Sequence, residues 1–215
     1  MARTPDPLTR SRILDAADRL LARDGFRRMT IEGVAGEAGV GKGSVYLHFE
    51  SKEDVALSCL DRMAEGVVRE LGTLASSPGT PAQRLRSMLC SRVLMRFDYA
   101  KRHAPSIDEK LAVMRQALLE RRSAHFAEEA RLVAKLVAEG QADGSFRADP
   151  PAETSARAMV TATNALLPYS LSVRELGRRA ALSTRLDELV ELLLAGLGHP
   201  GPAVRKSPTR SRRSS

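Results

Sequence analysis

The sequence predicts an all-α protein of about nine helices. Apolar residues recur every three or four positions along most of the chain, and no segment alternates apolar and polar residues over the length of a strand. Glycine and proline residues separate the periodic segments. Of the 215 residues, 43% are hydrophobic, which is enough for one large core or two small ones.

The first helix is expected to follow Pro7 and to run to about Asp24. Gly25 ends it, because glycine readily adopts the left-handed conformation past a helix end. One stripe of this helix is apolar and is expected to be buried. Its members are Ile13, Leu14, Ala17, Leu20 and Leu21.

Two short helices and a tight glycine turn come next. Thr30 is the expected N-cap of the second helix, Gly39 closes it, and a third helix covers about 42–48. Helices this short are not stable alone, so they must pack on the first helix and on the start of the fourth. This pattern predicts a helix-turn-helix, whose third helix suits insertion into the major groove of DNA.

The fourth helix is long. It begins at the capping-box pattern from Ser51 to Asp54 and ends in the breaker segment 76–81. A fifth helix covers 82–99, and a loop around His103-Ala104-Pro105 is expected to end it.

Two further helical segments follow. Residues 107–142 contain at least one long helix, which Gly140 and Gly144 close. Asp149 is the expected N-cap of a helix over 150–175, which Pro168 should kink or end early.

The last helix covers about 184–198. Thr184 and Asp187 form its expected capping pattern, and its leucine residues form a continuous face. The remaining residues, 199–215, have almost no apolar content and are expected to be disordered.

Net charge does not locate a nucleic-acid surface in this chain. The formal charge is +8, but residues 1–55 hold nine basic and nine acidic residues. The tail 199–215 holds five basic residues and no acidic one. Phosphate attraction by this tail and an inert, solvated terminus are both compatible with its composition. The basic residues concerned are Arg205, Lys206, Arg210, Arg212 and Arg213.

Several functional classes are disfavoured. No apolar run has the length of a membrane span, and the N-terminus lacks the apolar region of a secretory signal, so we expect a cytoplasmic protein. Cys59 and Cys90 are expected to be reduced thiols, with a redox switch as the alternative. The four histidines are scattered, and no zinc, phosphate-loop or nucleophile-elbow motif occurs. We therefore expect no enzyme activity, no metal and no cofactor.

The helix-turn-helix segment closely resembles the DNA-binding domain of the TetR family of transcriptional regulators. The matching segment is less than a quarter of the chain, and the remaining helices agree with that family only in number and order. The matching residues are Thr30, Val34-Ala35, Ala38-Gly39-Val40, Gly43-Ser44-Val45-Tyr46, His48-Phe49 and Lys52.

The resemblance implies that four residues contact the DNA backbone. Tyr46 and His48 match positions that clamp the backbone, while Thr30 and Lys52 match phosphate contacts at the starts of the second and fourth helices. Each has a structural alternative. Thr30 can be only a cap, Tyr46 a core residue, His48 a surface histidine and Lys52 an ordinary capping-box lysine.

The resemblance places Lys42, Gly43 and Ser44 where the family contacts base edges. Lysine suits guanine O6 and N7, serine can donate or accept, and glycine lets the backbone approach closely. Where the family commonly has serine or threonine, this chain has Gly41. Glycines at 41 and 43 predict an intrinsically weak third helix that tightens on DNA.

The resemblance also implies a dimer formed through the last two helices, about 150–175 and 184–198. A palindromic operator is recognised by two DNA-binding domains related by symmetry, and this requirement supports dimerisation independently. The leucine face can instead be wholly intramolecular core. Its expected dimerisation residues are Leu186, Leu189, Val190, Leu193, Leu194 and Leu197.

A small-molecule pocket between the middle helices is likewise implied by the family, although Met and Phe at helical spacing are usually core. The expected apolar lining consists of Leu89, Met95, Phe97, Met114, Leu118, Phe126 and Tyr169. The expected polar anchors are His103, His125 and Asn164.

These inferences divide the chain into four segments: a flexible arm 1–8, a helix-turn-helix DNA-binding domain 9–56, a ligand-binding and dimerisation domain 57–198 and the tail 199–215. The function expected is a dimeric repressor of transcription that a small-molecule effector releases from its operator. An activator, a ligand-independent regulator and a scaffold that has lost DNA binding are the alternatives.

Overall fold

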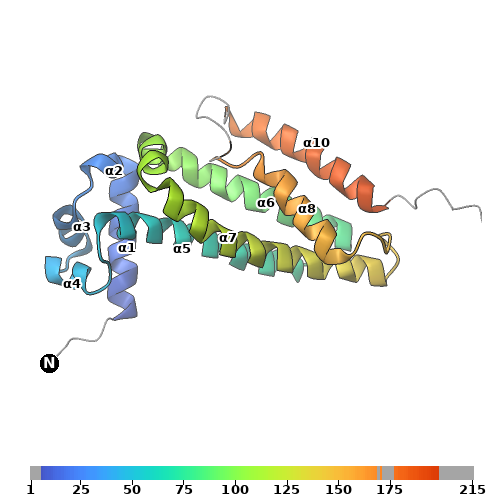
Figure 1. Cartoon of the computed structure of the whole chain (residues 1–215), viewed down its shortest axis with the longest axis horizontal. Coiled ribbons are helices and arrows are strands. Elements are labelled where there is room, and N and C mark those ends of the chain that lie inside the picture. The colour runs from blue at the N-terminus through green and yellow to red at the C-terminus, as the bar shows by residue number, and fades with distance from the viewer. Residues whose placement is uncertain (1–5, 169, 171–176, 199–215) are drawn as a thin grey trace, which may run out of the picture.

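The computed structural model describes residues 6–168, 170 and 177–198, with the backbone alone described for residues 104–119. Its regular elements are nine helices and no strands within these ranges, as the sequence predicts. Four helices form a small head at one end of an elongated body of five longer helices (Figure 1).

The head consists of α1 (Pro7–Arg23), α2 (Gly25–Arg28), α3 (Ile31–Ala38) and α4 (Lys42–Tyr46). Its predicted helix ends are confirmed. Gly25 and Gly39 both have positive φ, at 81° and 64°, and the Thr30 hydroxyl accepts a hydrogen bond from the Gly33 N–H at 3.0 Å. The single turn α2 was not predicted, and α4 ends two residues before the expected position.

The head has a hydrophobic core of its own. The predicted stripe of α1 is buried there together with the apolar face of α3, Val45 of α4 and Phe49. α5 (Lys52–Ala75) closes this core through Val55 and Ala56 and then continues into the body. The Ser51 hydroxyl caps α5 by accepting from the Asp54 N–H at 3.1 Å, as predicted.

The body contains the rest of α5 together with α6 (Pro81–Arg102), α7 (Ala104–Ala142), α8 (Ala152–Asn164) and α10 (Arg179–Gly198). These helices enclose a second, larger hydrophobic core. α8 lies between α7 and α10 on the face shown in Figure 1. None of the described helices combines the length and the hydrophobicity needed to cross a membrane.

The predicted loop between the fifth and sixth helices is almost absent. His103 ends α6, and α7 begins at the next residue with Pro105 in its first turn. Proline is favourable there because the first N–H groups of a helix have no intrahelical partner. The sequence His103-Ala104-Pro105 therefore ends α6 and also starts α7. α7 continues without interruption past Gly140 to Ala142.

The predicted starts of the last two helices are wrong. α8 begins at Ala152 after Pro151, not at Pro150, because a residue that precedes proline is disfavoured in the helical conformation. It ends at Asn164, four residues before Pro168. α10 begins at Arg179, so Thr184 is interior and its hydroxyl donates to the Ala180 carbonyl at 3.1 Å.

Candidate nucleic-acid interface and buried polar cluster

Helix α4 presents a polar face to solvent. Lys42, Gly43 and Tyr46 are exposed, with half of the Tyr46 surface accessible, whereas Val45 is fully buried and anchors the helix. Ser44 is half-buried. Tyr46 therefore does not belong to the head core, which removes the structural alternative for that residue.

No contact within the protein requires glycine at position 41, which caps α4, or at position 43 inside it. A Cβ atom added at Gly41 or Gly43 would meet no protein atom within 4 Å, and neither glycine has a positive φ. Gly39 differs, because its φ is +64° and an added Cβ would meet the Arg12 side chain. Glycine at 43 is thus not required by the fold of the isolated chain.

Lys42 is engaged within the head. Its ammonium forms an ion pair with Glu32 of α3 and lies 5.9 Å from the centroid of the Tyr46 ring. Both members of the ion pair are more than half exposed, so the pair contributes little stability. Lys42 can therefore exchange Glu32 for a stronger acceptor without a large penalty.

The other predicted backbone contacts lie at the borders of α3 and α5. Thr30 is exposed and caps α3. His48 is half-buried, with its ring centroid 6.3 Å from that of Phe49. The Lys52 ammonium lies 4.4 Å from the Phe26 ring centroid and 3.4 Å from the Arg27 carbonyl oxygen.

Arg12 is a head residue that no pattern in the sequence singles out. Its guanidinium donates to the carbonyl oxygens of Ala38 and Gly39 at 2.7 and 3.3 Å. These carbonyls belong to the turn between α3 and α4, so Arg12 fixes that turn to α1. An exposed arginine on an amphipathic helix has no sequence feature that distinguishes this role.

Two sets of polar contacts connect head and body. The Asp18 carboxylate of α1 accepts from the Tyr99 hydroxyl at 3.0 Å and lies 3.2 Å from His103 Nε2. Burial alone would raise the pKa of Asp18, but the hydrogen bonds and charges of His103 and Tyr99 together lower it. Burial and the Asp18 charge raise the pKa of Tyr99.

The second set joins α5 to α7. Arg121 lies 3.2 Å from Asp54 and 2.6 Å from Asp61, and His125 lies 3.4 Å from Asp61. Asp54 belongs to the first turn of α5, which is the next helix after α4. α7 therefore reaches from the body to the base of the head.

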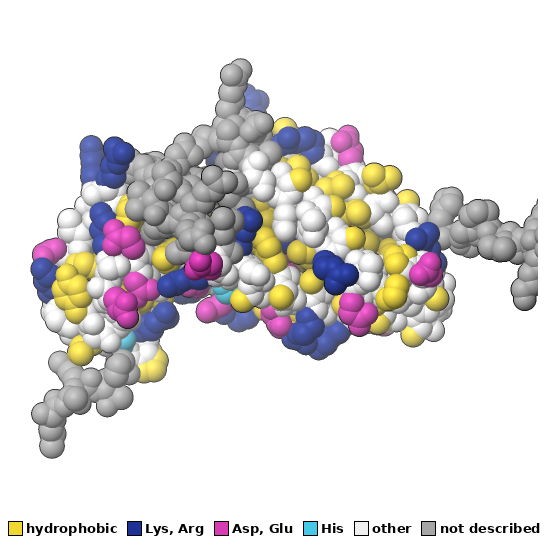
Figure 2. Space-filling view, in the orientation of Figure 1, with side chains coloured by type: hydrophobic (Ala, Val, Ile, Leu, Met, Phe, Trp, Pro, Cys, Tyr) yellow, Lys and Arg dark blue, Asp and Glu magenta, His cyan; other side chains and the backbone are white. Residues whose placement is uncertain are grey.

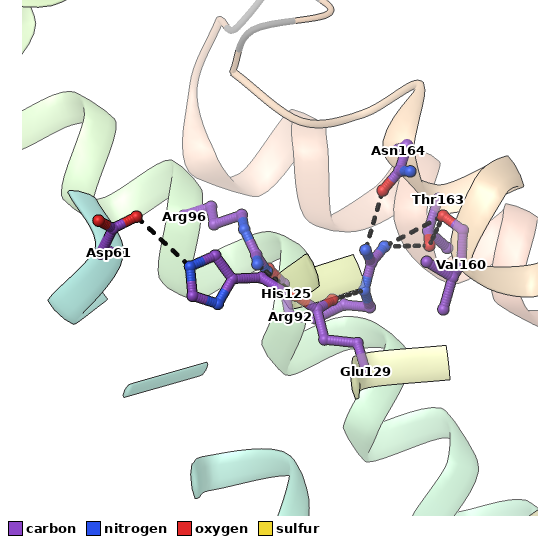
Figure 3. Close-up of polar contacts among 8 residues, drawn as sticks. All are labelled: Asp61, Arg92, Arg96, His125, Glu129, Val160, Thr163 and Asn164. Carbon is purple, nitrogen blue, oxygen red and sulfur yellow. Dashed lines mark hydrogen bonds and ion pairs between the residues drawn. The ribbon is translucent and has the colours of Figure 1, made fainter. Parts of the chain in front are cut away.

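A buried charged cluster lies deeper in the body (Figure 3). Arg92 and Arg96 of α6 and Glu129 of α7 are at most 2% exposed. The two guanidinium groups share the Glu129 carboxylate, with Arg92 Nε at 2.7 Å from Glu129 Oε2. Arg96 also donates to the Arg92 carbonyl at 2.9 Å.

The Arg92 guanidinium extends from Glu129 to α8. It donates to Asn164 Oδ1 at 2.8 Å and also to Thr163 and the Val160 carbonyl. The Phe126 ring lies beside the cluster, with the guanidinium carbons of Arg92 and Arg96 each 5.6 Å from its centroid. Sequence analysis missed this cluster, although Arg92 and Arg96 are four residues apart on the apolar stripe of α6.

An open groove of about 630 Å³ lies next to the cluster, between α7 and α8. Phe126 and Asn164, two of the residues expected to line a pocket, lie at one end of this groove. Small and charged residues form the rest of the lining. These are Ala127, Ala130, Arg131, Ala134, Lys135, Ala138, Glu153, Arg157, Val160 and Thr161.

The other residues expected to line a pocket are dispersed. Leu89 and Phe97 belong to the closed core, Met95 borders a smaller cavity beside α1, and His103 and His125 contact aspartates near the head. The side chains of Met114 and Leu118, and the whole of Tyr169, lie outside the described residues. The expected lining therefore does not form a single described site.

The leucine face of α10 is divided between the core and the surface. Leu186, Val190 and Leu197 are buried inside the monomer, and Leu193 and Leu194 pack partly against the core. Leu189 is half-buried and Leu192 is 71% exposed. Hydrophobic side chains are also visible over the α8 and α10 side of the molecule in Figure 2.

Both parts of this architecture match sequence profiles of one family. Residues 13–59, which form the head core, match "Bacterial regulatory proteins, tetR family". Residues 81–190, more than half of the chain, match "Tetracyclin repressor-like, C-terminal domain". The chain belongs to the TetR family. TetR proteins are regulatory proteins and not enzymes, in agreement with the expectation from the motifs.

A curated relative in the TetR family is the HTH-type transcriptional repressor KstR of Mycolicibacterium smegmatis, 35% identical over 80 residues. The match covers 37% of this chain and 39% of that repressor. For the first three curated relatives, the chain spans between 18% and 39% of their length.

Solved structures extend the TetR likeness over nearly the whole chain. The SmeT–triclosan complex has a TM-score of 0.65 at 22% identity, covering 94% of this chain and 98% of that one. FadR from Bacillus subtilis in complex with stearoyl-CoA has a TM-score of 0.60 at 17% identity, covering 87% and 98%. At these identities the likeness shows the fold alone.

Proposed function

We propose that the protein is a dimeric, sequence-specific transcriptional repressor that a small-molecule ligand releases from its operator. The observation that carries the proposal is the recognition helix α4, which is anchored by buried Val45 and presents Lys42, Gly43 and Tyr46 to solvent. A short helix held in this way can enter a major groove. Such a regulator acts on DNA in the cytoplasm.

The DNA contacts follow from the chemistry of the exposed groups. Lys42 and Ser44 are assigned to base edges and Gly43 to close backbone approach. Thr30, Tyr46, His48 and Lys52 are assigned to the phosphate backbone, which fixes the register of the head on the duplex. The half-buried positions of His48 and Lys52 leave them at the edge of this surface.

Dimerisation is assigned to the outer faces of α8 and α10. Since Leu186, Val190 and Leu197 already fill the monomer core, the contact must use Leu189, Leu192 and Leu193. Leu192→Glu is expected to convert a dimer into a monomer in sedimentation velocity. Leu8→Glu, at a leucine of α1 that is 75% exposed, is the matched control and should leave the assembly unchanged.

Release by a small molecule is supported by the groove between α7 and α8. It is also supported by two structural neighbours that were solved as complexes, one with triclosan and one with stearoyl-CoA. A ligand that binds one conformation of α7 better than the other would shift the position of the heads. The contacts of Arg121 with Asp54 and Asp61 provide a route from α7 to the head.

Footprinting on the DNA upstream of the protein's own gene tests DNA binding directly. We expect a protected palindrome, and Lys42→Gln should weaken binding by about 1–3 kcal/mol and relax specificity at one position of each half-site. Lys135→Gln, an exposed lysine of α7, is the matched control. Absence of any protected site would favour the scaffold alternative, and a reporter assay with and without the gene separates repressor from activator.

A further inference from the structure

We propose that Glu32 of α3 contacts a base: together with Lys42 it recognises one G·C pair in each half-site, and its carboxylate accepts a hydrogen bond from the cytosine N4 amino group. This inference rests on the proposed function, because it names a specificity-determining residue of the same DNA-binding surface. The observations that carry it are the ion pair between α3 and α4, the exposure of that pair and the bare backbone beside it.

Glu32 lies on the surface assigned to DNA, although it belongs to α3. Its carboxylate pairs with the ammonium of Lys42, the first residue of α4, and 63% of its side chain is exposed. Lys42 and Tyr46 are one turn apart on α4, and the ammonium lies 5.9 Å from the centroid of the Tyr46 ring. The packing of α3 against α4 (Figure 1) therefore places a carboxylate beside two residues assigned to DNA.

The second glutamate of α3 is placed differently. Glu37 lies 2.9 Å from Arg19 and 3.8 Å from Arg23, and both arginines belong to α1. Its carboxylate is thus directed to α1, whereas that of Glu32 is directed to α4. Glu37 therefore provides a matched control, since it is a glutamate of the same helix that is also engaged in ion pairs.

The backbone beside the ion pair carries no side chains at two positions. Gly36 follows Glu32 by one turn of α3, Gly43 follows Lys42 directly, and both glycines are exposed. A Cβ atom added at either glycine would meet no protein atom within 4 Å, and neither glycine has a positive φ. Since the fold does not require glycine there, the open space permits a base edge to approach the Glu32–Lys42 pair closely.

An acidic side chain at this surface needs a hydrogen-bond donor on the DNA. Glu32 repels phosphates, and its carboxylate loses its partner when Lys42 turns to guanine. A charge that is left unpaired in an interface from which water is excluded is costly. The donors that bases present in the major groove are the amino groups of cytosine N4 and adenine N6.

A G·C pair fits these two charges better than an A·T pair. Guanine N7 and O6 both accept from Lys42, and cytosine N4 comes next along the same edge, where it donates to Glu32. In an A·T pair the adenine N6 amino group lies between two acceptors, adenine N7 and thymine O4. A carboxylate bound to N6 would therefore be repelled by thymine O4, which has no counterpart beyond cytosine N4.

The first step of the test determines the preferred DNA sequence. The full-length protein selects duplexes from a library with a randomised segment. We expect a symmetric site with one G·C pair per half-site that disappears from the consensus in Glu32→Ala and in Lys42→Gln. Replacing that pair by A·T should weaken binding by the parent protein about 5-fold to 150-fold, the range for one mismatched base pair. Glu37→Gln should select the same consensus as the parent protein.

The second step removes one chemical group from the selected G·C pair. N4-methylcytosine keeps the base pair but replaces the N–H in the major groove by a methyl group. It should weaken binding by the parent protein at least about 5-fold and leave binding by Glu32→Ala unchanged, as expected for two groups in direct contact. Glu32→Gln should retain part of the effect, because its amide oxygen still accepts although the ion pair with Lys42 is lost. Equal behaviour of the Gln and Ala variants would show that Glu32 only positions Lys42 and would overturn the proposal.

Failure of this assignment can be distinguished from failure of the proposed function. If the parent protein selects a site and Glu32→Ala selects the same one, Glu32 has no role in recognition, and DNA binding stands. Uniformly tighter binding of all duplexes by Glu32→Ala leads to the same conclusion, because Glu32 would then only repel phosphates. Selection of no sequence by the parent protein would contradict the proposed function itself, and the role of Glu32 with it.

Discussion

The Arg121 guanidinium of α7 lies 2.6 Å from the Asp61 carboxylate of α5 and also contacts Asp54, which lies seven residues, or two helical turns, closer to the head. Arg121 neutralises two carboxylates on one helix, both within the segment that follows the recognition helix. The arginine is 38% exposed, so the contact contributes only about 0–1 kcal/mol to stability. The contact matters because it holds the first three turns of α5, residues 52–61, against α7.

We expect Arg121→Gln to leave the melting temperature nearly unchanged but to increase amide hydrogen exchange over residues 52–61, because the carboxylates lose their shared partner. Arg131→Gln, which breaks an exposed pair with Glu128 within α7, is the control and should leave exchange in α5 unchanged. Identical exchange in Arg121→Gln and the parent protein would show that this contact does not hold the base of the head.

Gly43→Ala should separate stability from DNA affinity. Alanine favours the helical conformation over glycine by roughly 0.5–1 kcal/mol, and an added Cβ meets no protein atom within 4 Å. The free protein should therefore become more stable, while operator affinity falls by about tenfold or more, about 1.4 kcal/mol, because the new methyl group occupies space assigned to DNA. Gly72→Ala in α5 has equally open surroundings and should stabilise without weakening DNA binding, as measured by chemical unfolding and fluorescence anisotropy.

Gly140→Ala should destabilise the body. An added Cβ would overlap the ring of Phe146, whose N–H donates to the Gly140 carbonyl at 2.8 Å in the turn after α7. Overpacking of this kind costs about 1–3 kcal/mol, which urea unfolding can measure. Gly196→Ala in α10 meets no atom and is the control. Equal stability of the two variants would mean that Phe146 moves aside freely.

Acid stability should depend on Asp18. Its pKa in the folded protein is below 3.8, since the contacts with His103 and Tyr99 outweigh burial. The carboxylate therefore contributes stability above about pH 3.8, and this contribution is lost as the pH falls further through the lower folded pKa. Asp18→Asn should flatten the fall of unfolding free energy in this acid range. Asp15→Asn, on the more exposed side of α1, is the control, and a slope unchanged by Asp18→Asn would contradict the assignment.

The head was largely predictable from sequence because its determinants are local. Thr30, Gly39 and Ser51 act as caps in the structure through contacts within three or four residues of themselves. The turn α2 could not be predicted, since four residues carry no periodic signal. Thr184 and Asp187 have the spacing of a capping box but lie inside α10, because that spacing also occurs within helices.

The body site was less predictable because it depends on distant segments. Arg92 meets Glu129 and Asn164 only when α6, α7 and α8 pack together, at sequence separations of 37 and 72 residues. A search for apolar pocket residues selected Leu89 and Phe97, which belong to the closed core. Two arginines on an otherwise apolar stripe were the available signal, since a buried charge requires a partner.

The uninterrupted course of α7 has a mechanical consequence. Its 39 residues extend for about 58 Å, and it packs against α8 near one end and against α1 and α2 near the other. A rigid rod of that length acts as a lever, so a tilt of roughly 5° about one end displaces the opposite end by about 5 Å. Hydrogen bonds to bases tolerate only a few tenths of an ångström. Under the proposed function, an effector would therefore need to cause only a slight rotation in the body for the heads of a dimer to lose their register on DNA.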